Sequence, residues 1–371
     1  MSEATPVLVE TVAREAAAMI CADRPLIDIR SARERELGVP DGAVTMSLES
    51  LLEQCLDKGQ QGFAAGYVIC AEGVRSLKAV NRLRDSGLDR FSSVSGGFKA
   101  WRDAGLPVTF PAGMKAEQCE RYARHLVMPQ VGAEGQRKLL NSRILLAGLG
   151  GLNSPVALYL AAAGVGSLGL VDHDSVERSN LQRQVVHGEA NLGEKKVKSA
   201  GARIRDLNPD VEVRVYDQMI DELNAASLLE SWDIVIDGTD SFPTRYALND
   251  ACVAQSKPLV YGAVMRYQGQ VSVFWPGQPE PAGRNAEARP CFRCLMPLEP
   301  APGDAPACSE AGVLGIMPGI IGTLQANEAL KLALGIGQSL VGSLLLIDAL
   351  NMDFRQMRIP ANPRCPSCGR S

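Results

Sequence analysis

One stretch decides the fold of most of this chain: Arg143-Ile144-Leu145-Leu146-Ala147-Gly148-Leu149-Gly150-Gly151-Leu152-Asn153-Ser154-Pro155. The apolar run 143–147 is typical of a buried strand, and the apolar residues 154–163 favour a helix. Glycines between a strand and a helix let the backbone approach a phosphate, and the helix N-terminus offers free N–H groups to an anion. Pro155 suits a first helical turn, where its missing N–H is not needed. The stretch therefore predicts an adenine-nucleotide site, with a tight structural turn as the alternative.

Further apolar runs surround this stretch. Strands are expected at 167–171, 233–236, 258–261 and 343–347, and strands that alternate with helices predict a doubly wound sheet. Residues 312–337 are expected to form a core helix, because Pro and charged residues interrupt the apolar run too often for a membrane span. Residues 275–304 are dense in Pro and Gly, which predicts a long, mobile crossing loop.

The N-terminal part of the chain shows a separate α/β pattern. Short buried strands are expected at 26–29, 67–70 and 91–94, with a helix over 74–86, which favours a parallel, helix-covered sheet. The stretch 106–113 is expected to be a linker. We therefore predict two domains, 1–110 and 111–371, which suits a chain of 371 residues.

Composition excludes several function classes. The net charge of -4 and the 5% aromatic content argue against a basic or base-stacking surface for nucleic acid. Because the first residues do not resemble a signal peptide and no membrane span is expected, the cytoplasm is the predicted location. In that reducing compartment the ten cysteines should be metal ligands, catalytic thiols or buried core residues.

The glycine pattern alone does not choose between NAD, FAD and ATP, so the residues after the next strands matter. Asp172 follows a strand where an acidic ribose partner belongs. The polar stretch 172–184, the basic 193–196 and Asp237-Gly238-Thr239-Asp240 supply basic groups and a carboxylate able to hold Mg²⁺. Those groups suit attack on a phosphate, which a dehydrogenase would not need. Ordinary solvated loops are the alternative for any one of these residues.

These motifs, in this order, resemble the MoeB/ThiF family of adenylyltransferases, which is related to ubiquitin-activating enzymes. The resemblance covers about 117–369 and implies ATP-dependent adenylation of a carrier protein that ends in Gly-Gly. It implies that Asp172 holds the ribose, that Asp240 coordinates Mg²⁺, and that Arg124 reaches the ATP of a partner subunit in a homodimer. It also implies a nucleotide site that includes Gly148, Gly150, Gly151, Asn180, Arg183 and Lys196. Asn153 departs from the family's usual Gly, and Asn is expected to tolerate a left-handed backbone there.

Two Cys-x-x-Cys pairs stand far apart in the sequence, Cys291/Cys294 and Cys365/Cys368. Four thiolates can close a tetrahedral structural zinc site that leaves no open position for catalysis. The alternative is a redox pair in each motif. A zinc of this kind is also what the family resemblance implies.

Cys70 ends a predicted buried strand and opens the loop Ala71-Glu72-Gly73-Val74-Arg75-Ser76. Free backbone N–H groups and Arg75 would stabilise a thiolate or a persulfide there, although a buried core cysteine is an equal alternative. With Leu26-Ile27-Asp28-Ile29-Arg30 and Ser95-Gly96-Gly97-Phe98, this loop resembles a rhodanese domain over about 1–110. The resemblance implies a persulfide on Cys70. Glu72 lowers the local positive potential, which weakens the case for a small anionic donor such as thiosulfate, so the sequence does not decide between thiosulfate and a cysteine desulfurase as the upstream sulfur donor.

Cys308 is the second candidate thiol, in Ala307-Cys308-Ser309. The resemblance implies that a cysteine here accepts the activated carrier or resolves a persulfide, with its thiolate as the nucleophile. Structural filler is the alternative.

The predicted fold is α/β, with a rhodanese-like parallel-sheet domain followed by a Rossmann-like doubly wound ThiF/MoeB domain. The predicted function is adenylation of a ubiquitin-like sulfur carrier of the MoaD/ThiS type and its conversion to a thiocarboxylate, with Cys70, Cys308, Arg183, Lys196 and Asp240 as catalytic residues. An oxidoreductase or a non-catalytic carrier-binding scaffold are the alternatives. The sequence does not name the carrier: molybdopterin, thiamine and tRNA-thiolation pathways all use such proteins.

Overall fold

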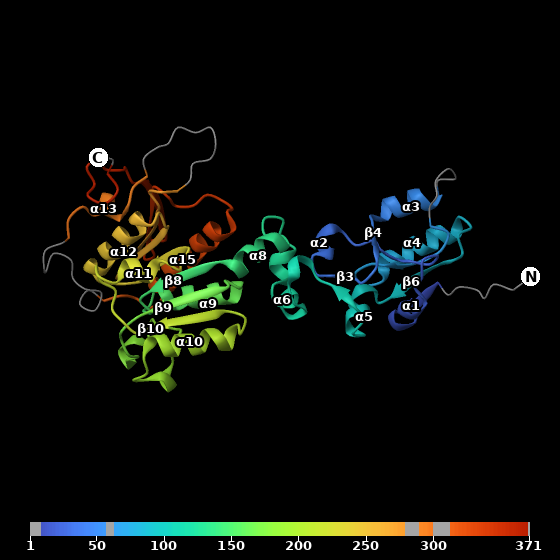
Figure 1. The fold of residues 1–371 in the computed structure, drawn as a ribbon, viewed down its shortest axis with the longest axis horizontal. Coiled ribbons are helices and arrows are strands. Elements are labelled where there is room, and N and C mark those ends of the chain that lie inside the picture. Colours follow the sequence, from blue (N-terminus) through green and yellow to red (C-terminus); the bar gives the residue numbers. More distant parts are fainter. Residues whose placement is uncertain (1–8, 57–62, 279–288, 300–311, 370–371) are drawn as a thin grey trace, which may run out of the picture. The chain divides into compact units, whose positions relative to one another are not determined.

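The computed structural model describes residues 9–56, 63–278, 289–299 and 312–369. The chain divides into two compact units, Met1–Arg137 and Lys138–Ser371, and each has its own sheet (Figure 1). Both units combine a sheet with helices, as the sequence predicts.

The main sheet of the first unit is parallel throughout, in the order β1-β6-β5-β2-β4. Its strands are β1 (Glu10–Val12), β2 (Leu26–Asp28), β4 (Val44–Thr45), β5 (Gly66–Ile69) and β6 (Phe91–Ser95). Leu51 and Leu83 pack against one face of this sheet, and Ala16 and Trp101 pack against the other. These side chains come from α3 (Leu48–Leu56), α4 (Val74–Asp85), α1 (Ala13–Met19) and α5 (Gly97–Asp103). The helix-covered parallel sheet is confirmed.

The stretch 106–113, predicted as a linker, is partly ordered within the first unit. Here β7 (Val108–Thr109) pairs antiparallel with β3 (Val39–Pro40). Beyond it come η1 (Pro111–Gly113), α6 (Ala116–Arg121) and α7 (Ala123–Leu126). The prediction of a linker was wrong for β7, because the hydrogen bonds that order it come from a strand far away in the sequence.

The sheet of the second unit has the order β10-β9-β8-β11-β12-β13-β14-β15, and its first five strands are parallel. The strands are β8 (Arg143–Ala147), β9 (Ser167–Val171), β10 (Glu212–Tyr216), β11 (Ile234–Asp237), β12 (Leu259–Met265), β13 (Gln268–Phe274), β14 (Ser343–Asp348) and β15 (Asp353–Arg358). The last three extend the sheet antiparallel. Of these, β14 was predicted as a strand at 343–347, whereas β13, β15 and the antiparallel pairing were not predicted. β15 is exposed along most of its length, so its sequence lacks the apolar alternation that marks a half-buried strand.

Helices cover both faces of this sheet, which confirms the doubly wound prediction. Leu160, Ile204 and Ala329 pack on one face and Leu229 and Leu248 on the other. These side chains come from α9 (Asn153–Ala163), α10 (Lys196–Leu207), α15 (Ile316–Leu334), α11 (Ala225–Leu229) and α12 (Phe242–Ala254). The helix α8 (Gly132–Asn141) leads into β8, and the expected crossing loop contains α13 (Phe292–Leu295).

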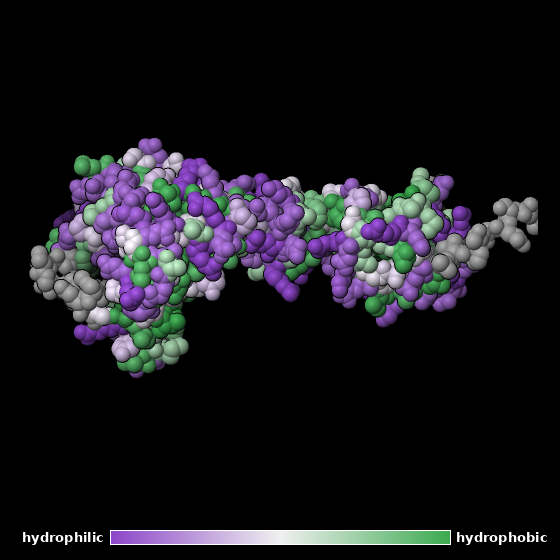
Figure 2. Space-filling view, turned by 90° about the horizontal axis from the view of Figure 1, so that it is seen from below, coloured by the Kyte–Doolittle hydropathy of each residue, from purple (hydrophilic) through white to green (hydrophobic). Residues whose placement is uncertain are grey.

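Polar and charged side chains are interspersed with smaller apolar patches over the face seen in Figure 2. None of the helices in the described ranges combines the length and hydropathy of a membrane-spanning segment.

Candidate functional site

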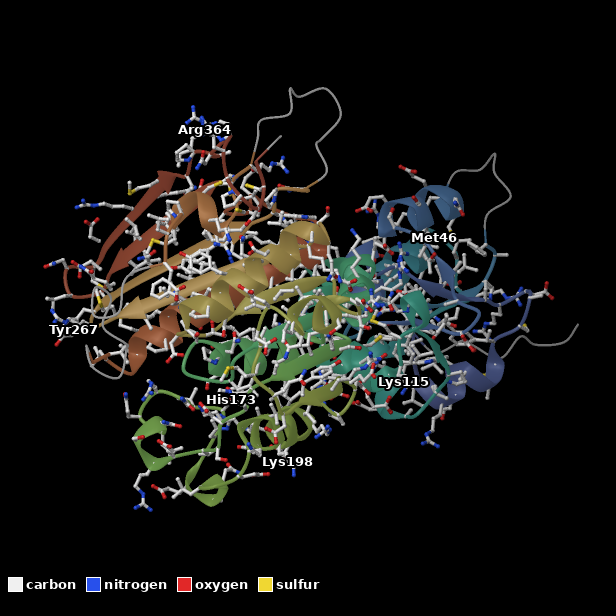
Figure 3. The ribbon with its side chains drawn as sticks, turned by 60° about the vertical axis from the view of Figure 1, so that its left-hand side comes forward. Met46, Lys115, His173, Lys198, Tyr267 and Arg364 are labelled. Atoms are coloured by element: carbon white, nitrogen blue, oxygen red, sulfur yellow. The ribbon has the colours of Figure 1, made fainter. Side chains whose placement is uncertain are left out.

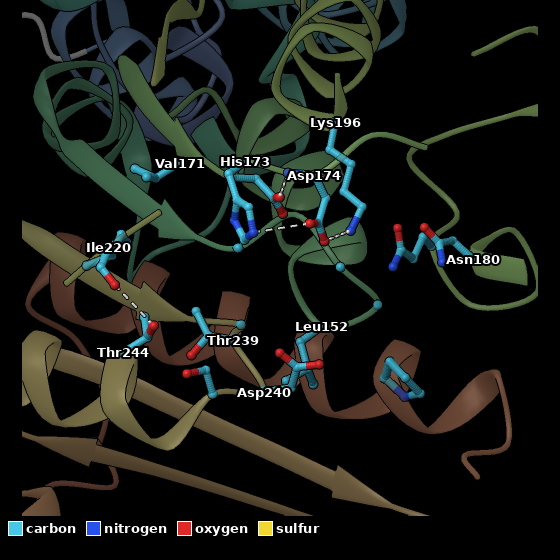
Figure 4. A pocket seen from close by; sticks show the side chains of 18 of the residues that line it. Leu152, Val171, His173, Asp174, Asn180, Lys196, Ile220, Thr239, Asp240 and Thr244 are labelled. Atoms are coloured by element: carbon cyan, nitrogen blue, oxygen red, sulfur yellow. Dashed lines mark hydrogen bonds and ion pairs between the residues drawn. The ribbon is translucent and has the colours of Figure 1, made fainter. Parts of the chain in front are cut away.

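A cavity of about 350 Å³ lies at the carboxyl ends of β8, β9 and β11 (Figure 4). Ligands bind at this edge of parallel sheets, because loops and helix N-termini converge there. The fold brings together residues from many segments of the chain, and the predicted nucleotide residues alone come from four of them. Every nucleotide residue predicted in this unit lines the cavity: Gly148, Gly150, Gly151, Asp172, Asn180, Arg183, Lys196 and Asp240.

The backbone geometry of the loop after β8 requires glycine at two positions. Gly148 has a left-handed φ of 77°, and its N–H donates to Val171 O at 2.8 Å. At Gly151 an added Cβ would lie 2.9 Å from Pro318 of α15. At Gly150 the same atom would meet only the Gln184 side chain, at 3.7 Å. The loop is therefore packed tightly at both ends and has room beside Gly150.

Asp172, the predicted ribose residue, fastens this loop to the end of β9. Its carboxylate accepts the Leu149 N–H at 2.6 Å and the Asp174 N–H at 2.8 Å. The side chain also lines the cavity, although the residue is only 8% exposed. Its interaction with a ribose stays a prediction, and its contact with the glycine loop is an additional role.

Asn153 does not use the left-handed backbone that the sequence led us to expect. It is the first residue of α9 and is fully buried. Its Nδ2 donates to Ala147 O at 2.9 Å and to Gly148 O at 2.7 Å. An added Cβ at Gly238 would lie 2.5 Å from the same Nδ2. The amide thus holds the loop after β8 closely against the loop after β11, which a glycine at 153 could not do.

Lys196 projects from the start of α10 into the cavity, where its side chain is only 7% exposed. Its Nζ pairs with Asp174 Oδ2 at 2.7 Å, as the dashed line in Figure 4 shows. Burial raises the pKa of Asp174, but the hydrogen bond and charge of Lys196, with the charges of His173 and Lys195, outweigh it and lower the pKa. The site therefore holds a nearly buried ammonium group, paired with an ionised carboxylate.

Asn180 and Arg183 approach the cavity from the turn η2 (Arg178–Asn180) and the residues after it. Asn180 Oδ1 accepts the Glu177 N–H at 3.3 Å, and Arg183 Nη1 donates to Ser179 O at 3.1 Å. Both polar side chains thus come from one short segment that lines the cavity.

Asp240 is exposed at the cavity and follows a well-supported loop. Thr239 donates its N–H and its hydroxyl to Asp237 Oδ1, at 2.9 and 2.7 Å. Arg245 Nη2 donates to Thr239 O at 2.6 Å, and Arg245 Nε lies 3.5 Å from Asp237 Oδ2. Burial raises the pKa of Asp237, against the opposing charge of Arg245. Asp237 and Arg245 thus fix the loop that presents Asp240.

His187 contacts the glycine loop through the backbone carbonyl of Leu149. Its Nε2 donates to Leu149 O at 3.2 Å, and Nδ1 bonds with Ser199 Oγ at 2.9 Å. Burial lowers the pKa of His187, although the Leu149 carbonyl opposes the shift. The neutral ring is therefore the form that suits this position.

Three residues that organise the cavity were not singled out from the sequence: Asp174, His187 and Arg245. Asp174 carried a signal, since it is a second carboxylate two residues after Asp172. His187 and Arg245 lie in no motif that we assigned, and only the packing of distant segments places them.

Two predicted residues are not part of the cavity as described. Arg124 lies exposed on α7, in the first unit, and is not among the residues that line the cavity. Cys308 lies outside the described residues.

The four predicted metal-binding cysteines come together. Cys291 and Cys365 have their sulfurs 3.5 Å apart, as have Cys294 and Cys368, and all four sulfurs lie within 4.8 Å of one another. A disulfide needs about 2.0 Å between sulfurs, whereas four thiolates at about 2.3 Å from a common centre suit tetrahedral Zn²⁺. Burial raises the pKa of Cys291 to about 12, so a thiolate there requires a nearby cation. The donor set therefore fits a metal.

One acidic residue of α12 links both cysteine pairs. Asp250 accepts hydrogen bonds from Nε and Nη2 of Arg293 and one from the hydroxyl of Ser367. Arg293 lies between the first two cysteines and Ser367 between the last two. Asp250 thereby holds the backbone segments that carry both pairs, and such contacts help to orient metal ligands.

Cys70 lies at the end of β5, is 1% exposed and faces the start of α4. Its sulfur accepts the Ser76 N–H at 3.3 Å and lies 3.3 Å from Ser76 Oγ. Burial raises the pKa of Cys70, but hydrogen bonds from Ser76 and from the backbone of Glu72 and Gly73 outweigh it, so the pKa is lowered. The loop thus favours an anionic sulfur.

The Cys70 loop is packed on the N-terminus of α5. An added Cβ at Gly97 would lie 2.4 Å from Cys70 O, and one at Gly73 would lie 2.9 Å from Gly96 N. The Phe98 N–H donates to Cys70 O at 2.8 Å. Gly73 and Gly97 therefore have a geometric reason, because a side chain at either position would push the two loops apart.

Comparison with protein families gives two matches. The model of the ThiF family matches residues 122–367, and that of the rhodanese-like domain matches residues 12–104. Both predicted families are confirmed.

Several curated relatives are similar to this chain. A sulfur carrier protein adenylyltransferase of Thermus thermophilus is 48% identical over 68% of this chain and 92% of its own length. The SAMP-activating enzyme E1 of Haloferax volcanii is 46% identical over 69% of this chain and 91% of its own length. The adenylyltransferase and sulfurtransferase MOCS3-1 of Zea mays is 41% identical over 94% of this chain and 67% of its own length.

Solved structures support the fold. Escherichia coli MccB has a TM-score of 0.58 at 20% identity, with 74% of this chain and 80% of that chain covered. At this identity the likeness concerns the fold alone. The chain therefore belongs to the ThiF family, and it carries a rhodanese-like domain ahead of the matched region.

Proposed function

We propose that this protein uses ATP to adenylate the C-terminal glycine of a ubiquitin-like sulfur carrier and then converts it to a thiocarboxylate with sulfur from Cys70. The observation that carries the proposal is the cavity, where the glycine loop, Lys196, Arg183 and Asp240 line one space. The names of the relatives in Thermus and Zea support both halves, adenylyl transfer and sulfur transfer.

In the proposed complex the ATP phosphates lie along the glycine loop. The open side at Gly150 and the N-terminus of α9 give backbone room and N–H groups for an anion. Asn180, Arg183 and Lys196, which also line the cavity, bind the phosphates through their side chains. Asp172 accepts a ribose hydroxyl while its present contact with Leu149 keeps the loop in place.

Asp240 is proposed to hold Mg²⁺, and its exposed carboxylate at the cavity fits a hard cation with oxygen ligands. When bound, Mg²⁺ neutralises charge on the phosphates. The Asp237 and Arg245 contacts keep the Thr239 backbone rigid, so that Asp240 starts from a fixed position.

In the first step an oxygen of the carrier's terminal carboxylate attacks the α-phosphorus. A new oxygen–phosphorus bond forms, the bond to the β-phosphate oxygen breaks, and pyrophosphate leaves. Arg183 and Lys196 stabilise the negative charge that develops. The step is needed because a free carboxylate resists attack by sulfur, whereas an acyl-phosphate has AMP as leaving group.

In the second step the outer sulfur of a Cys70 persulfide attacks the acyl carbon, and AMP leaves. The product is an acyl disulfide between the carrier and Cys70. A thiolate then attacks the Cys70 sulfur, so that the thiocarboxylate leaves and a new disulfide forms. Cys308 is our candidate for that thiolate, and an external thiol would have to reduce the disulfide afterwards.

The four-cysteine site is proposed to hold a structural Zn²⁺. Closed four-thiolate sites contribute to folding and leave no position for a substrate. Cys291, Cys294, Cys365 and Cys368 would bind it, and Asp250 would orient both pairs through Arg293 and Ser367. The resemblance also motivates our proposal of a homodimer in which Arg124 reaches the partner's ATP. The cytoplasmic location stays a prediction from the sequence.

Pyrophosphate release tests the proposal. The protein is incubated with Mg-ATP and a small carrier ending in Gly-Gly, with the same carrier lacking its last glycine as control. We expect pyrophosphate only with the complete carrier. An absorption spectrum with a bound flavin or nicotinamide would instead support an oxidoreductase, and carrier binding without pyrophosphate would support a scaffold.

A further inference from the structure

Two loops that contribute different groups to the cavity meet at one backbone carbonyl. Ala147 O, at the end of β8, accepts the Gly238 N–H at 2.9 Å. The same oxygen accepts a hydrogen bond from Asn153 Nδ2 at 2.9 Å, and Nδ2 also donates to Gly148 O at 2.7 Å. The glycine loop after β8 and the loop after β11 are therefore joined at Ala147 O, and the Asn153 amide is the third member of this junction.

The Asn153 amide is also packed directly against Gly238. A Cβ added at Gly238 would lie 2.5 Å from Nδ2, 2.6 Å from Cγ and 3.0 Å from Oδ1 of Asn153. Carbon atoms in ordinary contact lie about 3.5–4.0 Å apart, so the amide leaves no room for a side chain at 238. The φ of Gly238 is not left-handed, so this contact, and not the backbone conformation, requires the glycine.

Burial shows what the Asn153 side chain contributes. The residue is fully buried, and both partners of its nitrogen are carbonyl oxygens, which need a donor. Its Oδ1 is buried as well and meets no hydrogen-bond donor among the residues that the structure describes. An unpaired buried acceptor lowers stability. The contribution of this amide therefore comes from the two bonds of its nitrogen and from its packing on Gly238.

The junction lies two residues before Asp240, the candidate Mg²⁺ ligand. Gly238, Thr239 and Asp240 line the cavity from one loop and Gly148 from the other (Figure 4). The two loops also touch, since a Cβ added at Gly148 would lie 3.2 Å from Gly238 O. Asn153 is not among the residues that line the cavity, so any effect of its side chain on a nucleotide must pass through these loops.

Other contacts hold the loop after β11 without the Asn153 amide. Gln325 of α15 is fully buried and donates from Nε2 to Asp237 O at 2.8 Å. The Asp237 side chain accepts the two hydrogen bonds of Thr239. These contacts fix the conformation of the loop itself. Asn153 differs from them because its amide contacts both loops and can set the distance between them.

We propose that Asn153 is a positioning residue for the metal–nucleotide complex: its amide sets the separation between the glycine loop and the loop of Asp240, and Gly238 is the small partner that this separation requires. The inference rests on the proposed function, in which the phosphates lie along the glycine loop and Asp240 holds Mg²⁺. Mg²⁺ demands a nearly ideal octahedral arrangement of oxygens, so a carboxylate that shifts relative to the phosphates binds it less well. Loss of the amide should therefore reduce the contribution of Mg²⁺ to ATP binding.

The test compares the affinity for ATP in excess Mg²⁺ with the affinity for ATP in EDTA, measured by calorimetry on the full chain without carrier. The ratio of the two affinities, here called the Mg²⁺ ratio, gives the factor by which Mg²⁺ tightens ATP binding. Asn153→Ala removes the amide and keeps a strong helix former at the start of α9. We expect the Mg²⁺ ratio to fall about tenfold, the scale for one or two lost hydrogen bonds.

Asn208→Ala is the matched control. Asn208 is also fully buried, and its Nδ2 donates to Ala161 O, near the other end of α9, at 2.7 Å. Its loss removes the same kind of hydrogen bond to the same helix, away from the two loops. We expect this variant to melt at a lower temperature and to keep the Mg²⁺ ratio of the wild type.

A second pair of variants tests the separation by size. Gly238→Ala places a methyl group against the Asn153 amide, and this overpacking should lower the Mg²⁺ ratio by about 30-fold. In the double variant Asn153→Ala/Gly238→Ala the three amide atoms that would clash are gone. The Mg²⁺ ratio should therefore return to that of Asn153→Ala alone, whereas residues that act independently would show added losses.

Thermal melting of every variant separates a loss of fold from a change in the loops. The inference would be overturned if Asn153→Ala melted lower but kept the Mg²⁺ ratio of the wild type, or if the double variant were no better than Gly238→Ala. A wild-type ratio in Gly238→Ala would overturn it too, even if Asn153→Ala failed to fold. The proposed function fails by a different result: wild-type protein that binds Mg-ATP but releases no pyrophosphate with any Gly-Gly carrier.

Discussion

The two loops that we assign to chemistry occupy equivalent places in their sheets, but they differ in how many segments of the chain contribute to each site. Each follows a parallel strand, β5 or β8, and each leads into a helix, α4 or α9. The Cys70 loop places most of its donors to sulfur within seven residues, Cys70 to Ser76. The glycine loop at Gly148 supplies only backbone groups and space for the phosphates. The charged side chains around it come from three other segments. In this protein the anionic sulfur has its donors in one loop, whereas the proposed triphosphate site draws on several segments at the edge of the sheet.

The comparison predicts that the two chemistries can be separated. Cys70→Ala should abolish thiocarboxylate formation, because no persulfide can form, while carrier adenylation stays within a factor of about two. Asp240→Asn should lower adenylation by roughly 100-fold or more and leave persulfide formation on Cys70 unchanged. Mass spectrometry of the carrier and of the Cys70 peptide measures both. Asp210→Asn, an exposed carboxylate before β10, is the control, and loss of both activities in either variant would mean that the loops do not work independently.

Lys196 sharpens the comparison, because the nucleotide site should depend on a charged side chain from another segment, whereas the Cys70 loop supplies the uncharged donors to its own sulfur. Lys196→Met keeps the length and the apolar stem of a nearly buried residue and removes its charge. We expect kcat/KM for adenylation to fall about 100-fold, the range for one lost donor to a developing charge. Lys198→Met on the same helix, labelled in Figure 3, removes an exposed lysine and should have no effect. If Lys196→Met and Lys198→Met lowered kcat/KM equally, the cause would be a change in the helix α10 and not the loss of the Lys196 charge.

The zinc site tests whether the larger unit, unlike the first, depends on a metal for its stability. Cys365→Ser should remove bound zinc and destabilise the fold by about 4 kcal/mol, the scale for a lost structural metal. For a unit of this size that lowers Tm by roughly 8–16 °C. Zinc content and thermal melting are measured together, with exposed Cys21→Ser as control. Wild-type protein that holds no zinc, yet melts at the same temperature with and without a chelator, would contradict the assignment.

His187 should give the smallest effect. Its pKa is lowered in the folded protein, so the neutral form is favoured there. Its contribution is complete above the ordinary pKa of about 6.5 and is lost as the pH falls below it, through the folded pKa. ATP affinity should therefore fall as the pH falls. In His187→Gln, which keeps a donor for Leu149, ATP affinity should depend less steeply on pH than in the wild type. At neutral pH we expect the ATP affinity of His187→Gln to differ from that of the wild type by no more than about fivefold, which corresponds to the loss of one hydrogen bond. ATP binding is titrated at several pH values for the wild type and for His187→Gln. The same pH dependence of ATP affinity in both proteins would contradict the prediction.

Much of this architecture could be predicted because it depends on local patterns. The strands 143–147 and 167–171 were predicted to the residue, since a buried parallel strand is one continuous apolar run. The eight nucleotide residues lie together because the carboxyl ends of parallel strands share one edge. The four metal-binding cysteines could be predicted because each Cys-x-x-Cys pair is a local motif. One pair supplies only two of the four ligands of a tetrahedral metal site, so the two pairs are expected to come together.

The remaining features depend on contacts between distant segments. Asn153 was interpreted as a loop residue, yet its side chain bonds the carbonyls of Ala147 and Gly148 and packs against Gly238. The strand β7 depends on β3, and Glu34 meets Arg75 across 41 positions. No periodicity or spacing in the sequence encodes such pairings, because they arise only when the sheet brings the strand ends together.

The account's central claim is that one chain both activates a carrier and supplies its sulfur. The most direct measurement is the intact mass of a Gly-Gly carrier after a single turnover with Mg-ATP, a thiol reductant and protein that was loaded with persulfide on Cys70 and freed of excess donor. We predict that sulfur replaces one oxygen of the terminal carboxylate and that AMP and pyrophosphate appear in equal amounts. A carrier that returns unchanged while AMP accumulates would show that the acyl-adenylate forms and is hydrolysed, and that Cys70 is not its sulfur source.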